Sequence, residues 1–443
     1  MSIYSINFKE KYIQISMVIT TIVMTIFRFL MNEKGRVNPD SIVYMRFAHV
    51  FPTIDSTVAP PGYPMMIKFF TFFGLDEFWG SKALGICAVL FIILFAYYKK
   101  FYLREIILVC SLFSYVSIFS FTMSEALLLP FVFLLLYLAH LAITEKLSST
   151  KAFIYLALNL IILYNIRYSS LFIIGATGLF GLLFWKKKFG KTFILAGSIG
   201  MAYVVLFKLF YLDYFNENYI KDSLITGLHT TPELLKEFVQ GITTAFNPFI
   251  HMANPNGGIV NFAIYGLGLL NILLMVFLFI KNKLSETQLF YLNIGICGII
   301  CSYFIQYFYP INPLDYRLLS PFLLSIWMVY FQILLKYFGN KTFVIGALSL
   351  CSGFVFTWLS KGNYLENRKI ITEYLQKEKL DKIPLQFFVV KEENLEKIQV
   401  AEILSTVNPQ ITLTYKASDT LRPTTLTRYK VLQKIKIDKN KYQ

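Results

Sequence analysis

Two carboxylates and two guanidiniums stand at the edges of long apolar runs in this sequence. Asp40 follows the first run in NPDSIVYMRF, and Glu125 opens a later run in TMSEALLLPF. Arg167 lies in the short turn YNIRYSSLFI, and Arg317 opens another run in YPINPLDYRLLSPF. A carboxylate held at such an edge can accept a proton from a hydroxyl group. A guanidinium can hold a phosphate through its planar fork of donors.

Each of these residues also has a purely structural interpretation. The stretch Asn38–Asp40 is a good helix start, in which an acid gains from the helix dipole. Glu125 can likewise be a helix-start acid, although a carboxylate at membrane depth is costly and is usually functional or paired. Arg167 and Arg317 can extend to lipid headgroups, and Arg317 can pair with Asp315. Local sequence alone therefore leaves both interpretations open.

The composition is that of a membrane protein. Of the 443 residues, 56% are apolar and 15% are charged, whereas soluble domains have about 45–50% and about 25%. Much of the net charge of +16 lies in short loops between apolar runs, so it indicates membrane topology rather than nucleic-acid binding. All five cysteines fall inside apolar runs, which excludes a disulfide framework in the loops.

Eleven apolar runs are close to the ~20 residues that cross a bilayer. We place them at 12–31, 78–98, 104–121, 124–144, 151–166, 169–185, 192–211, 259–280, 287–308, 316–335 and 342–360. Lys and Arg gather in alternate short loops, which predicts a cytoplasmic N-terminus and an extracytoplasmic C-terminus. All four charged candidates then lie on the outer side of what we expect to be a bacterial inner membrane.

The sequence predicts a mainly α, polytopic membrane domain over 1–360 and a small extracytoplasmic α/β domain over 361–443. Two outer loops are long, at 32–77 and 212–258. In the first loop, Tyr44, Phe47 and Phe51 form an apolar stripe that predicts a surface helix over 40–51. The segment APPGYPMMIKFF, with Tyr63 on its apolar face, predicts a second helix on the surface or partly embedded in the membrane, and a plain re-entry turn is the alternative.

The order of these segments resembles the GT-C superfamily of polytopic glycosyltransferases, especially the branch of protein O-mannosyltransferases and lipid A aminoarabinose transferases. The segments DSIVYMRFAHV, PPGYP, SEALLLPF, IRYSSLFI and DYRLLSPF carry the resemblance, over residues 40–322. The sequence departs from the pattern at Ala59, where many members have Lys or His before the two prolines. It also has Tyr316 before Arg317, whereas the family has the order Arg-Tyr.

The resemblance implies an inverting transfer of a sugar from a polyprenyl-phosphate donor to a hydroxyl of a glycan, lipid or protein acceptor. Asp40 would be the base, and Glu125 would either assist it or hold a divalent metal, for which these two acids are the only candidate ligands. The implied donor-phosphate residues are Arg317, Arg167, Arg46 and Lys68. The candidate substrate-binding residues are Tyr44, Tyr63, Tyr316 and His251, although a surface position is the favoured interpretation of His251.

Three other functions fit parts of the sequence. An O-antigen-type polymerase or ligase also uses lipid-linked sugar at the outer face, but such enzymes typically place their key residues in a large late loop. A lipid-linked sugar transporter or flippase needs charged residues in the middle of several spans, and few such charges are seen. A non-catalytic scaffold that binds a partner through its tail is the third. The partners expected of the enzyme are membrane lipids, the lipid-linked donor and the acceptor.

Overall fold

The protein is mainly helical in the computed structural model, which describes residues 8–33, 35–54, 57, 59–216, 230–253, 257–306, 314–360, 362, 364–388 and 403–414. The first half contains α1 (Phe8–Leu30), η1 (Met31–Glu33), α2 (Pro39–Val50), α3 (Gly62–Thr71), α4 (Glu77–Lys99), α5 (Leu103–Ser111), α6 (Phe113–Phe119), α7 (Ser124–Ile143), α8 (Ser149–Ile166), η2 (Tyr168–Ser170), α9 (Leu171–Leu183), α10 (Lys188–Phe207), η3 (Lys208–Leu212) and α11 (Asp213–Phe215). The second half contains α13 (Thr231–Ala245), α14 (Ile259–Lys281), α15 (Glu286–Ile305), α16 (Tyr316–Phe338), η4 (Gly339–Thr342), α17 (Phe343–Leu359), α18 (Tyr364–Lys377), β1 (Gln386–Phe388) and β2 (Thr412–Thr414).

The predicted membrane class is confirmed: this is a polytopic helical membrane protein. Within the described residues, eight helical stretches are long and apolar enough to cross a membrane. The described part of each of the eleven predicted runs falls largely on helix. Eleven predicted runs give eight spanning stretches for physical reasons. The run 104–121 is divided between α5 and α6 because Leu112 has extended backbone, at φ −64° and ψ 134°. The run 169–185 contains the short α9, and α16 continues through η4 into α17 as one stretch.

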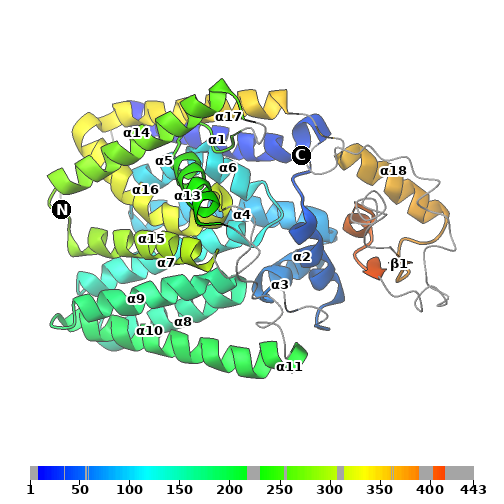
Figure 1. The fold of residues 1–443 in the computed structure, drawn as a ribbon, viewed down its shortest axis with the longest axis horizontal. Helices are drawn as coiled ribbons and strands as arrows, with labels where there is room; N and C mark the ends of the chain where they lie inside the picture. Colours follow the sequence, from blue (N-terminus) through cyan, green and yellow to red (C-terminus); the bar gives the residue numbers. More distant parts are fainter. Residues whose placement is uncertain are drawn as a thin grey trace. The chain divides into compact units, whose positions relative to one another are not determined.

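The chain divides into two compact units. The first comprises Met1–Thr25, Ile86–Phe119 and Ser124–Phe354. Helix α16 is central to it: most of its side chains are buried, and it packs against α5, α7, α13 and α15. Figure 1 shows α8, α9 and α10 lying together, in agreement with their mutual contacts.

Two glycines explain how closely some of these helices approach. A Cβ on Gly197 of α10 would lie 2.8 Å from the Cα of Gly178 on α9. A Cβ on Gly268 of α14 would lie 1.8 Å from the carbonyl oxygen of Thr243 on α13. Neither distance is possible for a larger residue without movement of a helix, so both helix pairs require glycine at the contact.

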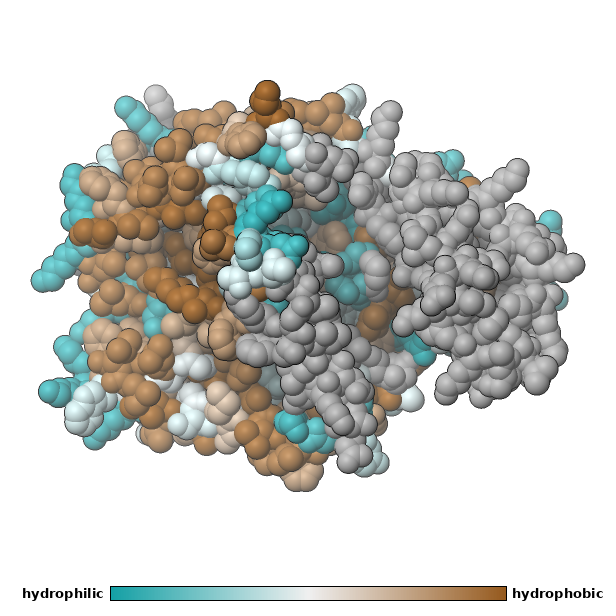
Figure 2. Space-filling model, in the orientation of Figure 1, coloured by the Kyte–Doolittle hydropathy of each residue, from teal (hydrophilic) through white to brown (hydrophobic). Residues whose placement is uncertain are grey.

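The outward faces of the first unit are apolar. Exposed large side chains include Leu195 and Val205 on α10 and Phe262, Leu273 and Phe277 on α14. Figure 2 shows hydrophobic residues spread over the visible face of the helices. A monomeric soluble protein rarely exposes apolar surface on this scale, whereas lipid tails cover such a surface readily.

The second unit comprises Ile26–Gly85, Ser120–Met123 and Val355–Gln443, so it combines the segment between α1 and α4 with the tail. The two segments share one hydrophobic core, in which Val37, Met45 and Phe78 join residues of the tail. The buried tail residues are Tyr364, Ile371, Leu375, Leu380, Leu385, Phe387, Ile403, Leu404 and Ile411.

The tail contains both helix and strand, as expected. Strands β1 and β2 pair in parallel, with Gln386 opposite Thr412 and Phe388 opposite Thr414. They fall in PLQFFVV and QITLTY, two stretches in which polar and apolar residues alternate as in a strand, and a short helix lies at 403–407. A third alternating stretch, YKVLQKIKI, also predicts a strand, but it lies outside the described residues. A separate domain that begins at residue 361 remains a prediction.

Candidate active site

Glu125 is the buried centre of the candidate site in the first unit. It lies in the first turn of α7, and its side chain has no exposed surface. Its Oε2 is 3.0 Å from Nη1 of Arg167, and its Oε1 is 3.6 Å from Nε of Arg317. A fully buried carboxylate is stable only when it is paired or hydrogen-bonded, and here two guanidiniums provide the compensating charge.

Arg167 is positioned by the turn between α8 and η2. Its backbone leaves α8 with extended geometry, at φ −156° and ψ 130°. Nη1 also donates to Oγ of Ser124 at 2.9 Å, and Nε donates to Oγ of Ser169 at 3.1 Å. Its Nη2 makes no hydrogen bond or ion pair within the part of the chain that the structure describes. The arginine is therefore fixed at two nitrogens and keeps donors for a further acceptor.

Arg317 is held by the start of α16. Asp315 caps this helix by accepting from the backbone N–H of Arg317 at 3.0 Å and of Leu318 at 3.2 Å. Burial raises the pKa of the Asp315 carboxyl, although the Arg317 guanidinium and the Leu318 N–H act in the opposite direction. Two acids and two arginines from α7, the α8–η2 turn and α16 thus form one charged cluster.

Two predicted substrate-binding residues lie beside this cluster. The rings of Tyr316 and His251 are 3.9 Å apart, and the His251 ring is 4.4 Å from that of Phe113. His251 is 2% exposed, so the favoured prediction of a surface position is wrong. The physical reason is that aromatic residues from α6 and α16 enclose its imidazole.

Asp40 lies in the second unit, in the first turn of α2. Asn38 caps the helix by accepting from the backbone N–H of Ser41 at 3.0 Å, and the Ser41 hydroxyl accepts from the Asn38 N–H in return. The predicted helix start is confirmed. Asp40 itself is exposed, and the Asn38 amide donates to its Oδ2 at 3.4 Å. Glu125 belongs to the other unit, and a common site for Asp40 and Glu125 remains a prediction.

The segment that carries α2 is fastened by a buried lysine that the sequence analysis missed. Nζ of Lys82, on α4, donates to the carbonyl oxygens of Arg36 and Ser120 at 2.9 and 3.0 Å. It also donates to Oγ1 of Thr122 at 2.8 Å, and it lies 5.0 Å from the centroid of the Phe78 ring. The Ser41 hydroxyl adds a bond of 2.8 Å to the carbonyl oxygen of Thr122. These bonds join the backbone that leads into α2 to the segment 120–122.

Arg46 and Lys68, the other predicted phosphate residues, also lie in the second unit. Arg46 lines a cavity of ≈ 290 Å³ together with Gln410 and Thr412. Nζ of Lys68 donates to the backbone oxygen of His49 at 3.2 Å, which uses one of its three hydrogens. The structure therefore brings Arg167 and Arg317 to Glu125. A role for Arg46 and Lys68 at the same site remains a prediction.

The last two predicted substrate-binding residues, Tyr44 and Tyr63, form an edge-to-face pair. Their ring centroids are 5.0 Å apart, and both side chains are buried. This pair joins α2 to α3, so both rings contribute to the packing of these two helices.

A divalent metal does not fit the surroundings of Glu125. Both of its oxygens face guanidinium groups, whereas magnesium or calcium would need several oxygen ligands there. Within the described residues, no group of three or more His, Cys, Asp or Glu side chains is placed to hold a metal.

Comparison with known proteins gives matches among solved structures. No family model and no curated protein matches the sequence. The chain is similar to an oligosaccharyltransferase of Archaeoglobus fulgidus tethered to an acceptor peptide, with a TM-score of 0.49 and 11% identity over 91% of this chain and 64% of that chain. It is also similar to ArnT of Cupriavidus metallidurans bound to undecaprenyl phosphate, with a TM-score of 0.45 and 12% identity over 94% and 90%. Both are membrane glycosyltransferases of the GT-C superfamily, the group that the sequence resembles.

Proposed function

We propose that the protein is a membrane glycosyltransferase that moves a sugar from a polyprenyl-phosphate donor to a hydroxyl of a glycan, lipid or protein acceptor. The observation that carries the proposal is the buried Glu125 between Arg167 and Arg317, contributed by separate elements. On the predicted topology this cluster lies at the extracytoplasmic face, where such a donor presents its phosphate.

In this proposal the two arginines bind the donor phosphate. Guanidinium groups pair with phosphate through parallel N–H donors, and such charge-assisted bonds are about twice as strong as neutral ones. Nη2 of Arg167 supports this role because it has no partner within the described residues. Glu125 fixes both side chains in advance, so that binding the phosphate costs little further ordering.

Asp40 is the proposed base. Its carboxylate accepts the proton of the acceptor hydroxyl as that oxygen attacks the anomeric carbon of the sugar. The bond between the anomeric carbon and the phosphate oxygen breaks, and the phosphate remains on its lipid. A single displacement of this kind inverts the anomeric configuration. The arginines stabilise the negative charge that grows on the leaving phosphate.

Replacement of the base tests the proposal. Asp40→Asn should abolish sugar transfer in membrane vesicles while the protein remains folded and abundant, because the amide cannot accept the proton. Glu366→Gln is a matched control, since Glu366 is an exposed acid in the same unit. Full transfer by Asp40→Asn would exclude Asp40 as the base.

The same assay separates the enzyme from a transporter. An enzyme forms a new glycosidic bond and releases polyprenyl phosphate, both of which mass spectrometry detects. A transporter or flippase moves the donor across the membrane and leaves the sugar on its lipid. Detection of translocation without a new glycosidic bond, in protein with all candidate residues intact, would overturn the proposed reaction.

A further inference from the structure

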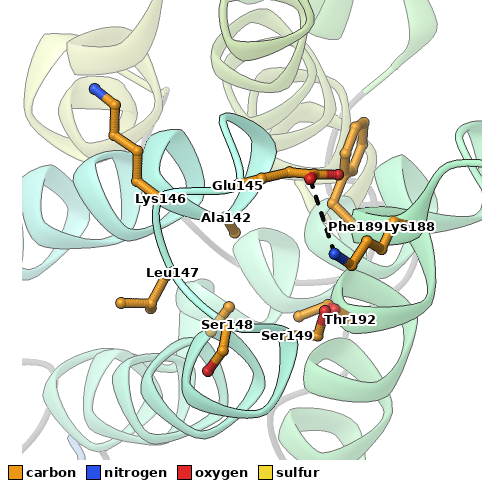
Figure 3. Close-up of a pocket in the computed structure, with 10 residues that line it drawn as sticks. Ala142, Glu145, Lys146, Leu147, Ser148, Ser149, Lys188, Phe189 and Thr192 are labelled. Atoms are coloured by element: carbon orange, nitrogen blue, oxygen red, sulfur yellow. Dashed lines mark ion pairs between the residues drawn. The ribbon is translucent and has the colours of Figure 1, made fainter.

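A polar cavity of ≈ 140 Å³ lies at the other end of the predicted topology, among the ends of α7, α8 and α10. Figure 3 shows the residues that line it. Its volume is enough for on the order of ten water molecules. Its lining includes Glu145, Ser148, Ser149, Lys188 and Thr192.

Two helices begin at this cavity. Helix α8 starts at Ser149, and its cap Ser148 accepts from the Lys151 N–H at a long 3.5 Å. Helix α10 starts at Lys188 and has no side-chain cap. The first N–H groups of a helix carry partial positive charge, so two such starts in one cavity favour an anion.

A buried hydroxyl is a second and independent indication of a ligand. Thr192 is 4% exposed and lines the cavity, and no hydrogen bond joins its hydroxyl to any residue that the structure describes. Buried hydroxyls are normally hydrogen-bonded, and helical threonines often bond to the carbonyl four residues earlier. The Thr192 hydroxyl is therefore available to a bound group.

The charges around the cavity point in the same direction. Lys186, Lys187, Lys188 and Lys191 gather at the start of α10. Cations at a helix start are unfavourable, because they oppose the helix dipole. Among the described residues, acids lie close to only two of the four lysines. Lys187 is 3.0 Å from Glu286, and Lys188 is 3.8 Å from Glu145. An anion in the cavity would offset the remaining repulsion.

We propose that this cavity binds a phosphate group, carried by an anionic phospholipid of the inner leaflet. The predicted topology places the cavity at the cytoplasmic face, where lysine-rich segments meet anionic headgroups. The proposed donors are the Lys188 ammonium, the Thr192 and Ser149 hydroxyls and the first N–H groups of α10.

Two charged side chains at the cavity, Glu145 and Lys146, are not among the proposed donors. Glu145 opposes an anion, but its pair with Lys188 is long and exposed, so Lys188 can turn to a phosphate with little loss. Lys146 points away from Lys188 in Figure 3, so it is left out of the proposed donor set. Binding should therefore depend on Lys188 and Thr192 and should weaken with salt.

Native mass spectrometry of the full chain in detergent, titrated with short-chain phosphatidylglycerol, measures this binding. Lys188→Gln should weaken the affinity about tenfold, the loss expected for one charge-assisted hydrogen bond. Thr192→Val should weaken it about threefold, whereas Thr192→Ser, which keeps the hydroxyl, should retain it. Lys283→Gln is the matched control, because Lys283 is an exposed lysine in another loop of the same predicted face.

Two outcomes would overturn the proposal. One is an equal loss in Lys188→Gln and Lys283→Gln, which would indicate only general surface charge. The other is full retention of affinity by both Lys188→Gln and Thr192→Val. Inorganic phosphate and phosphatidylcholine, titrated in parallel, distinguish the sources of the phosphate. If inorganic phosphate binds as tightly as phosphatidylglycerol, the site is a phosphate site and the lipid is excluded as its specific ligand.

Discussion

The pair between Glu125 and Arg167 allows the sharpest test of the candidate site. Glu125→Gln keeps the shape of the side chain and removes its charge, which leaves two guanidiniums without their acid. Breaking a buried ion pair typically costs about 3–5 kcal/mol of unfolding free energy. Arg167 is 16% exposed and keeps its bonds to Ser124 and Ser169. We therefore expect a loss near the lower limit, about 3 kcal/mol.

A double-mutant cycle isolates the pair itself. Glu125→Gln, Arg167→Gln and the double variant are compared by denaturant unfolding in mixed micelles, followed by far-ultraviolet circular dichroism. The coupling free energy should be about 1–3 kcal/mol, as for contacting charged residues. The parallel cycle with Arg317→Gln should give a smaller coupling, because its Nε is 3.6 Å from Glu125 Oε1 rather than 3.0 Å.

The cycle also has a functional readout. Arg167→Gln should weaken the binding of polyprenyl phosphate about tenfold, because one charge-assisted bond to phosphate is lost. A coupling below about 0.5 kcal/mol, the usual value for independent sites, would refute the reasoning that Glu125 holds Arg167. Unchanged lipid binding in Arg167→Gln and Arg317→Gln would refute the phosphate role.

Four further changes test the fold around the site. Phe78→Ala should destabilise the second unit by about 3–5 kcal/mol, measured as earlier proteolysis of the tail, whereas Phe72→Ala, at an exposed phenylalanine, should not. Lys82→Met should cost about 2–3 kcal/mol in thermal unfolding, because buried acceptors lose their donor. Gly268→Val should separate α13 from α14, which cysteine cross-linking between these helices would detect as a lower yield. The raised pKa of Asp315 means that its contribution to stability is fully present below the usual aspartate pKa and is lost as the pH rises through the raised value. That dependence should be absent from pH-resolved unfolding of Asp315→Asn.

The features that depend on nearby residues were predictable from the sequence. The start of α2 was correct because Asn38 and Ser41 form a reciprocal cap over only three residues. The meeting of Glu125, Arg167 and Arg317 joins distant parts of the chain, but it was predictable because the predicted topology places all three at one end of their helices. Residues that share one membrane face can meet only within that plane, so fewer arrangements are possible. The order of segments in the chain then indicates which residues meet.

Other contacts between distant parts of the chain were not predictable. Lys82 lies inside a predicted span and bonds to backbone that precedes and follows it by about forty residues, so no local pattern indicates its role. The break at Leu112 has no proline or glycine beside it, and the sequence reads as continuous helix there. Hydropathy likewise gives no information on which residues of the tail meet Met45 and Phe78.

The shared core of the second unit has a consequence for the biosynthesis of the protein. Phe78 and Met45 are made early, but the side chains that cover them, from Tyr364 to Ile411, are made last. The ribosome adds about 5–20 residues per second, so these early residues wait at least about fifteen seconds for their partners. A chain that stops before residue 364 cannot close this core, and so only the completed polypeptide presents α2, with Asp40, in its final surroundings.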